Sequence, residues 1–187
     1  MKIKIVAVCG SIRTVSANLD ILKFIGKILS ANADFTIYDG LADLPAFNPD
    51  FDAENTNYQN SEVDRWRKLL RAADAVIFCT PEYAHGVPGV LKNALDWVVS
   101  SGELVDKPTL VITASPSEFG GEKAMASLLP TLIVMSAKIL DNGTMMIPFV
   151  KKKLDKDGDI SDEKTIRAIN LMLDLLLNSA SRFRNEH

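Results

Sequence analysis

The sequence predicts an α/β protein whose core is a doubly wound parallel sheet of five strands with helices on both faces. Five short apolar runs alternate with segments in which apolar residues recur every three or four positions. Three of the runs are nearly continuous and rich in β-branched residues, as expected of strands that are buried on both faces. The alternation of strand and helix, repeated five times, indicates right-handed crossovers within one sheet.

The expected strands are short, and each is followed by a segment long enough for a helix. The first, third and fourth contain the sequences IKIVAV, AVIFC and TLVIT, which are the most strongly apolar. The expected bounds of the five strands are Ile3–Val8, Phe35–Tyr38, Ala75–Cys79, Thr109–Thr113 and Thr144–Ile147.

Helical spacing of apolar residues covers residues 19–29, 63–73 and 90–98, and a further helix lies near the end of the chain. This last helix has a polar stripe that runs from Arg167 to Ser181. It also carries more apolar residues than one core-facing stripe requires, which predicts at least a dimer. The apolar residues concerned are Ile166, Ile169, Leu171, Met172, Leu173, Leu175, Leu176 and Leu177.

Composition is that of a globular protein and excludes several classes of function. The 187 residues are 47% hydrophobic and 24% charged, and we expect one domain over residues 1–187. A net charge of −3 argues against a nucleic-acid partner and against a polybasic membrane binder. Two cysteines and two histidines are too few for a usual zinc site, so no metal is expected. Because no apolar stretch approaches the ~20 residues of a membrane span, we expect a cytoplasmic protein with reduced thiols.

Two long connections differ from the β-α repeat. Residues Gly40–Asn60 contain prolines, acidic residues and aromatics, and a loop of this length and composition is expected to pack and to serve a function. Residues Lys151–Glu163 are charged and rich in turn-forming residues, which predicts a solvated connection. Their DKDGD sequence resembles part of a calcium-binding loop, but the remaining ligand positions are absent.

The loop after the first strand has the composition of an anion site. In a doubly wound sheet, ligands bind beyond the carboxyl ends of the strands, where this loop begins a helix. It offers hydroxyl groups, one amide and one cation beside the free N–H groups of the helix start, which suits a phosphate monoester. These side chains belong to Ser11, Arg13, Thr14, Ser16 and Asn18. The alternative is an ordinary serine cap with a surface arginine.

The loops after the third and fourth strands are also candidates for ligand contact. Residues Pro81–Gly89 contain two prolines and two glycines, and Tyr83 offers a flat face to a planar ligand. Residues Ser115–Gly121 end in paired glycines, which allow a backbone to approach a ligand closely. The alternatives are a rigid connection in the first case and a turn that starts a helix in the second.

Two of these segments carry a family resemblance. GSIRTVSAN and PEYAHGVPGVLKNALDW resemble the family patterns GSxRxxSxN and PEYNxSxPGxLKNAIDW of the NADPH-dependent FMN reductases. This family includes quinone, chromate and azo-dye reductases on a flavodoxin-like fold. The similarity extends to about residue 150. The resemblance implies a sheet with strand order 2-1-3-4-5.

The resemblance also implies which residues contact FMN. Four of them, in the first loop, would hold the phosphate: Ser11, Arg13, Ser16 and Asn18. Those lining the isoalloxazine ring would be Pro81, Glu82 and Tyr83, and those closing its other side Ser115, Gly120 and Gly121. The candidate set is completed by Ala17, Ala84 and His85. The sequence departs from the family at Ala84, where Asn is usual, at Gly86, where Ser is usual, and at Lys123, where Arg is frequent.

The resemblance implies an FMN-dependent oxidoreductase that passes hydride from NADPH or NADH to quinones, flavins or similar small acceptors. The cofactor carries the chemistry, so no catalytic side chain is expected. A homodimer or homotetramer is expected, with the Gly40–Asn60 loop near the flavin of one subunit. The alternatives are a flavodoxin-type electron carrier and a non-enzymatic module that has lost flavin binding.

Histidine and cysteine side chains are the remaining candidates for a role in the chemistry. His85 is the one candidate for proton delivery, although an exposed loop side chain is the favoured interpretation. Cys9 and Cys79 would lie on neighbouring strands, where a redox pair is conceivable but two small core residues are favoured.

Overall fold

The computed structural model describes residues 2–29, 31, 33–52 and 59–186, and its centre is a parallel sheet. The strand order is β2-β1-β3-β4-β5, which confirms the predicted fold class and sheet order. All neighbouring strands pair in parallel. The strands span β1 Ile3–Cys9, β2 Ala33–Tyr38, β3 Ala75–Thr80, β4 Pro108–Ala114 and β5 Lys138–Ile147.

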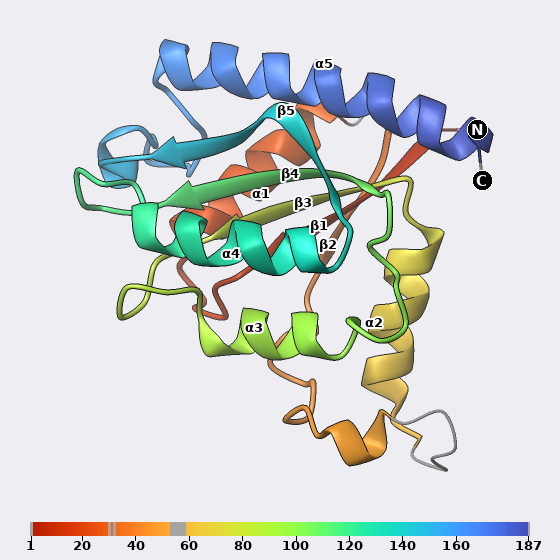
Figure 1. Cartoon of the computed structure of the whole chain (residues 1–187). Helices are drawn as coiled ribbons and strands as arrows, with labels where there is room; N and C mark the ends of the chain where they lie inside the picture. The colour runs from red at the N-terminus through yellow and green to blue at the C-terminus, as the bar shows by residue number, and fades with distance from the viewer. Residues whose placement is uncertain (1, 30, 32, 53–58, 187) are drawn as a thin grey trace.

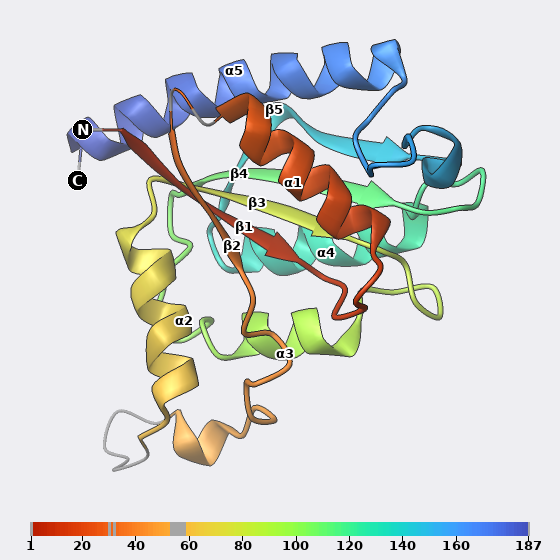
Figure 2. The same cartoon turned by 180° about the vertical axis from the view of Figure 1, so that it is seen from behind.

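Helices cover both faces of the sheet (Figures 1 and 2). Helices α1 and α5 lie on one face, and α2, α3 and α4 lie on the other, as both views show. Their bounds are α1 Ala17–Leu29, α2 Ser61–Ala72, α3 Gly89–Asp96, α4 Glu122–Val134 and α5 Glu163–Glu186. Two short 3-10 turns complete the set, η1 Pro49–Phe51 and η2 Val150–Lys152.

The central strands divide their side chains between two cores. In β1, Ile5 and Ala7 pack with α1 and α5, whereas Val6 and Val8 pack with the helices of the other face. Strands β3 and β4 alternate in the same way, and all of their residues are buried. The apolar runs are continuous because neither face of these strands meets solvent.

Strand β5 starts earlier than the sequence predicts. The expected start was Thr144, whereas the strand begins at Lys138. It forms an edge of the sheet, where half-exposed polar residues are tolerated, so its first half lacks an apolar run. The pairing with β4 shifts register between Thr109 and Val111, and Asn142 has a φ of 60°. This irregularity removes the period-two pattern that identifies a strand.

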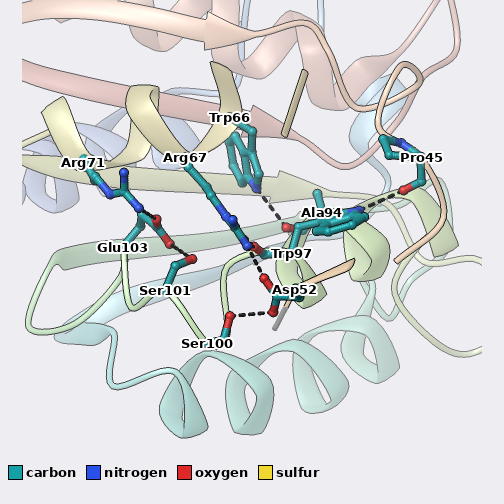
Figure 3. Close-up of polar contacts among 10 residues, drawn as sticks. All are labelled: Pro45, Asp52, Trp66, Arg67, Arg71, Ala94, Trp97, Ser100, Ser101 and Glu103. Carbon is teal, nitrogen blue, oxygen red and sulfur yellow. Dashed lines mark hydrogen bonds and ion pairs between the residues drawn. The ribbon is translucent and has the colours of Figure 1, made fainter. Parts of the chain in front are cut away.

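The first part of the Gly40–Asn60 loop packs against α2 and α3, as the sequence predicts (Figure 3). The indole N–H of Trp97 donates to the Pro45 carbonyl at 2.8 Å. The guanidinium of Arg67 pairs with Asp52, whose carboxylate also accepts from Ser100 at 2.5 Å. These contacts fix the loop to α2 and to the residues that end and follow α3. Residues 53–58 lie outside the described residues, and the contact with a flavin of another subunit stays a prediction.

A lysine is buried at the start of β4. Lys107 is 4% exposed, and its ammonium donates to the Leu70 carbonyl at 2.5 Å. Burial lowers the pKa of Lys107 to about 8, although the carboxylates of Asp74 and Glu103 partly oppose this shift. The folded protein therefore releases a proton that the unfolded chain keeps until a higher pH.

We predict that Lys107→Met changes the pH dependence of stability. Between about pH 8 and about pH 10 the unfolded lysine binds more protons, so this group makes the free energy of unfolding rise with pH. The wild type should gain about 1–2 kcal/mol relative to Lys107→Met between about pH 7.5 and about pH 9.5. Urea unfolding of both proteins at both pH values measures this difference.

The wild type must be compared with the variant because other groups also change the free energy of unfolding in this pH range. Burial raises the pKa values of the Cys9 and Cys79 thiols, so above the pKa of the unfolded thiols they make the free energy of unfolding fall with pH. Lys68→Met, at an exposed position of α2, is the matched control. Parallel pH profiles for the wild type and Lys107→Met would contradict the assignment.

Candidate functional site

A cavity of about 420 Å³ lies at the carboxyl ends of the central strands. This volume is within the roughly 300–1,000 Å³ range of small-molecule and cofactor sites. Loops that follow β1, β3, β4 and β5 enclose it. These loops gather at the end of the sheet toward which the strand arrows point (Figure 1).

The structure brings nine of the thirteen predicted site residues to this cavity. These nine are Ser11, Arg13, Ser16, Ala17, Asn18, Pro81, Glu82, Tyr83 and Ser115. The other four do not line it among the described residues: Ala84, His85, Gly120 and Gly121. The sequence analysis missed eight lining residues, namely Val15, Asp20, Ala114, Pro116, Val150, Lys151, Leu154 and Asp155.

The loop between β1 and α1 is held close to the end of β3. A Cβ atom on Gly10 would lie 2.1 Å from the Thr80 hydroxyl oxygen, so only glycine fits there. The loop then reaches Ser16, whose hydroxyl accepts from the Leu19 N–H at 3.4 Å and caps α1. Ser11 accepts from the Arg13 N–H at 3.4 Å, and its hydroxyl lies 3.5 Å from that of Tyr83. Two loops thus meet at one wall of the cavity.

The side chain of Asn18 serves the fold. Its amide donates to the Ala114 carbonyl at 3.3 Å, and its carbonyl oxygen accepts from the Cys79 thiol at 3.4 Å. Asn18 is buried, and these contacts tie the start of α1 to the ends of β3 and β4. Its side chain therefore positions the first loop, and its predicted contact with a phosphate stays a prediction.

The two cysteines are paired in register on neighbouring strands but carry free thiols. Both side chains belong to the core between the sheet and helices α1 and α5. Burial raises the pKa of Cys9 and raises that of Cys79 well above its usual value. They are small core residues, which is the interpretation that the sequence favoured.

Glu82 anchors the loop after β3 to the start of α4. Its carboxylate accepts from the backbone N–H groups of Lys123 at 2.8 Å and Ala124 at 3.2 Å. A carboxylate at a helix N-terminus is stabilised by the free N–H groups and by the helix dipole. The other carboxylate oxygen lies 3.5 Å from the imidazole of His85, whose side chain is 85% exposed.

A tight turn follows Tyr83. Tyr83 and Gly86 exchange two backbone hydrogen bonds of 3.0 Å, and the two residues between them have positive φ angles, 48° for Ala84 and 61° for His85. This is the geometry of a type I′ turn, in which Asn and Gly are preferred. Ala84 occupies the position where the family pattern has Asn, so the backbone gives a reason for that Asn besides any contact with a ligand.

The paired glycines after β4 allow close packing within the protein. Gly120 and Gly121 have φ angles of 61° and 87°. A Cβ atom on Gly120 would lie 2.9 Å from the Pro148 nitrogen, and one on Gly121 would lie 2.9 Å from the Thr113 Cβ. Thr113 also donates to the Gly120 carbonyl at 2.8 Å. The loop after β4 is thereby pressed against the ends of β4 and β5.

The connection Lys151–Glu163, which the sequence predicts to be solvated, is largely exposed, and its first part also lines the cavity. The Val150 N–H donates to the Ser115 carbonyl at 3.0 Å, which joins the segment to the loop after β4. Asp159 pairs with Lys27 of α1 at 2.5 Å. We call residues 150–155 the fourth wall of the cavity.

Other surfaces of the molecule are less suited to a ligand. A shallow hollow of about 1110 Å³ runs along the edge strand β2, far from the carboxyl ends of the strands. Two of its four lysines, Lys23 and Lys27, have carboxylate partners. Within the described residues there is no cluster of three or more metal-binding side chains. No helix in the described part of the chain has the length and apolarity to span a membrane.

Residues 3–152 match the model of the family described as NADPH-dependent FMN reductase. The chain belongs to this family. It is 32% identical to NADH-dependent flavin reductase subunit 2 of Lactobacillus johnsonii, over 90% of this chain and 92% of the relative. It is 30% identical to a quinone reductase of Escherichia coli K12, over 88% of each chain.

Solved structures agree with this placement. FerB of Paracoccus denitrificans, a flavoenzyme NAD(P)H:(acceptor) oxidoreductase, superposes with a TM-score of 0.84 at 27% identity, over 96% of this chain and 98% of that one. A WrbA-like flavodoxin of Agrobacterium tumefaciens has a TM-score of 0.63 at 18% identity, over 98% and 99% of the two chains. The latter likeness shows the flavodoxin-like fold alone.

We predict that Ala84→Asn stabilises the protein. Alanine in a left-handed conformation is strained, whereas Asn tolerates it, so the free energy of unfolding should rise by roughly 0.5–1 kcal/mol. Urea unfolding of the flavin-free protein measures this change. Ala126→Asn, on the exposed side of α4, is the matched control and should destabilise, because Asn has a lower helix propensity than Ala. A loss of stability in Ala84→Asn would contradict the strained turn.

Proposed function

We propose that the protein is an FMN-dependent NAD(P)H oxidoreductase that reduces quinones, flavins or similar small acceptors. The observation that carries this proposal is the convergence of two family motifs, from the loops after β1 and β3, on one cavity. Family membership and the quinone-reductase name of one relative support the reaction class.

The residues of the cavity fit FMN. One end offers the start of α1, the hydroxyls of Ser11 and Ser16, and the guanidinium of Arg13, which suit a phosphate monoester. Another part offers the ring of Tyr83, which is 44% exposed, and the backbone beside Pro81. We propose that the first group holds the phosphate and that the second lies along the flavin ring.

In the proposed mechanism the protein binds and orients rather than donating or accepting protons. When bound, FMN supplies the hydride-accepting chemistry. The β1–α1 and β3–α3 loops would bind and orient the flavin ring, since Asn18 and Glu82 anchor these loops to the fold. The side chain of Val15 and the ring of Tyr83 line the cavity and are exposed, so they are available to cover a bound ligand. His85 has no assigned role in this mechanism, because its side chain points into solvent.

We further propose a homodimer or homotetramer that uses NADPH or NADH and acts in the cytoplasm. The exposed apolar residues Leu171 and Leu175, one turn apart on α5, support association between subunits. Free, buried thiols are consistent with a reducing compartment.

The deciding experiment is a visible absorption spectrum of the purified protein after FMN has been added and unbound flavin removed. NADPH is then added without oxygen, followed by a quinone. We expect a retained yellow chromophore that bleaches with NADPH and recovers with the quinone. A retained chromophore that stays oxidised would identify an electron carrier instead. A protein that no flavin titration can colour would identify a module without the cofactor.

We predict that Arg13→Ala weakens FMN binding. A hydrogen-bonded ion pair between the guanidinium and the phosphate is worth several-fold to a hundred-fold in affinity, so Kd should rise about ten- to a hundred-fold. Quenching of flavin fluorescence during titration measures Kd. Arg167→Ala, on α5 outside the cavity, is the control and should bind FMN normally. An unchanged Kd in Arg13→Ala would remove this residue from the site.

A further inference from the structure

The fourth wall contains three consecutive lysines after Val150, and they differ in what they contact. The Lys152 ammonium lies 5.2 Å from the centre of the Phe149 ring. The Lys153 ammonium donates to the Thr165 hydroxyl at 3.2 Å. Lys151 lines the cavity, and its ammonium has no partner among the residues that the structure describes. Of the three, Lys151 is therefore the one available to a ligand of the cavity.

The backbone that carries Lys151 is held firmly. Val150 is 2% exposed, and its N–H donates to the Ser115 carbonyl at 3.0 Å. Phe149 has a left-handed φ of 50°, and its N–H donates to the Ser117 carbonyl at 3.0 Å. Lys151 thus follows two residues that are fixed to the loop after β4. Its position at the cavity is set by the fold and does not need a ligand to form.

The rest of this segment contacts α1 at both of its ends, with Gly158 at the first turn and Asp159 at the last turn. Gly158, with a φ of 83°, packs so closely on Asp20 that a Cβ atom would lie 3.2 Å from the carboxylate carbon. Asp159 pairs with Lys27, and a bridge joins Leu154 to Ile160. The fourth wall therefore adjoins the start of α1, which is the part of the cavity that suits a phosphate.

The charged groups of the cavity differ in whether they have partners. Its three carboxylates are all engaged: Glu82 accepts from two N–H groups of α4, Asp155 accepts from two N–H groups of its own turn, and Asp20 lies 4.0 Å from the Lys23 ammonium. Its two cations, Arg13 and Lys151, have no carboxylate partner within the described part of the chain. The cavity is consequently prepared for an anion that these two cations share.

We propose that Lys151 is a second cation for a phosphate monoester bound in this cavity, contributed by a different wall from Arg13. This inference rests on the proposed function and deepens it. Two ligands of the proposed reaction carry this chemistry, since FMN has a 5′-phosphate and NADPH has a 2′-phosphate. Lys151 therefore determines either the preference for FMN over riboflavin or the preference for NADPH over NADH.

The test compares Lys151→Ala with Lys152→Ala, its neighbour outside the cavity, and with Lys151→Arg. Titration with FMN and with riboflavin gives a Kd for each flavin. If the 5′-phosphate is the ligand, Lys151→Ala should raise Kd for FMN about five- to ten-fold and leave Kd for riboflavin unchanged. Lys151→Arg should restore tight binding of FMN, and Lys152→Ala should resemble the wild type. The effect should shrink as salt is added, because salt screens exposed charges.

Steady-state kinetics with saturating FMN distinguish the second source. If the 2′-phosphate is the ligand, Lys151→Ala should raise KM for NADPH about five- to ten-fold with little change for NADH, and binding of FMN should be normal. A selective effect in either arm supports the proposal and identifies the phosphate.

The proposal is overturned if the wild type binds FMN while Lys151→Ala changes neither the ratio of Kd for FMN to Kd for riboflavin nor the ratio of KM for NADPH to KM for NADH. The proposed function itself fails in a different way, since the wild type would then bind no FMN or would bind FMN without oxidising NADPH. Because Lys151 is exposed, its substitution should not disturb folding, and circular dichroism of each variant checks this.

Discussion

Strands β3 and β4 are buried on both faces, as is β1 except at Lys4, and this constraint determines where the site lies. Such strands need helices above and below them. In a parallel sheet each helix returns the chain to the end of the sheet where the strands begin, so the carboxyl ends of all the strands lie together at the opposite end. The loops that follow the strands therefore lie near one another at this end of the sheet, and here they enclose the cavity.

The cavity keeps its shape through side chains that bind the protein itself. Asn18 joins α1 to two strand ends, Glu82 joins the loop after β3 to α4, and Gly10 lets the first loop approach Thr80. These positions belong to the motifs by which the family is recognised. Part of each motif therefore stabilises the loops that form the site. Backbone groups and a few side chains without partners in the described part of the chain are left to contact a ligand.

Most of the fold could be predicted because apolar strands and helical spacing are local signals in the sequence. The start of β5 could not, since an edge strand with an irregular register needs no apolar run. The loops after β1 and β3 were found because their motifs are contiguous. The fourth wall was missed because its charged composition is that of a solvated loop. The contact that fixes the following residues, between Lys27 and Asp159, joins residues far apart in the chain.

For the reduction of quinones proposed above, the burial of the two thiols has a chemical consequence. Quinones are electrophiles that form adducts with thiolates, and the protonated thiol reacts far more slowly. Cys79 ends beside the site, hydrogen-bonded to Asn18, yet burial keeps both it and Cys9 in the neutral form at physiological pH. Thiols can therefore lie close to the cavity without forming adducts with the quinones proposed as acceptors.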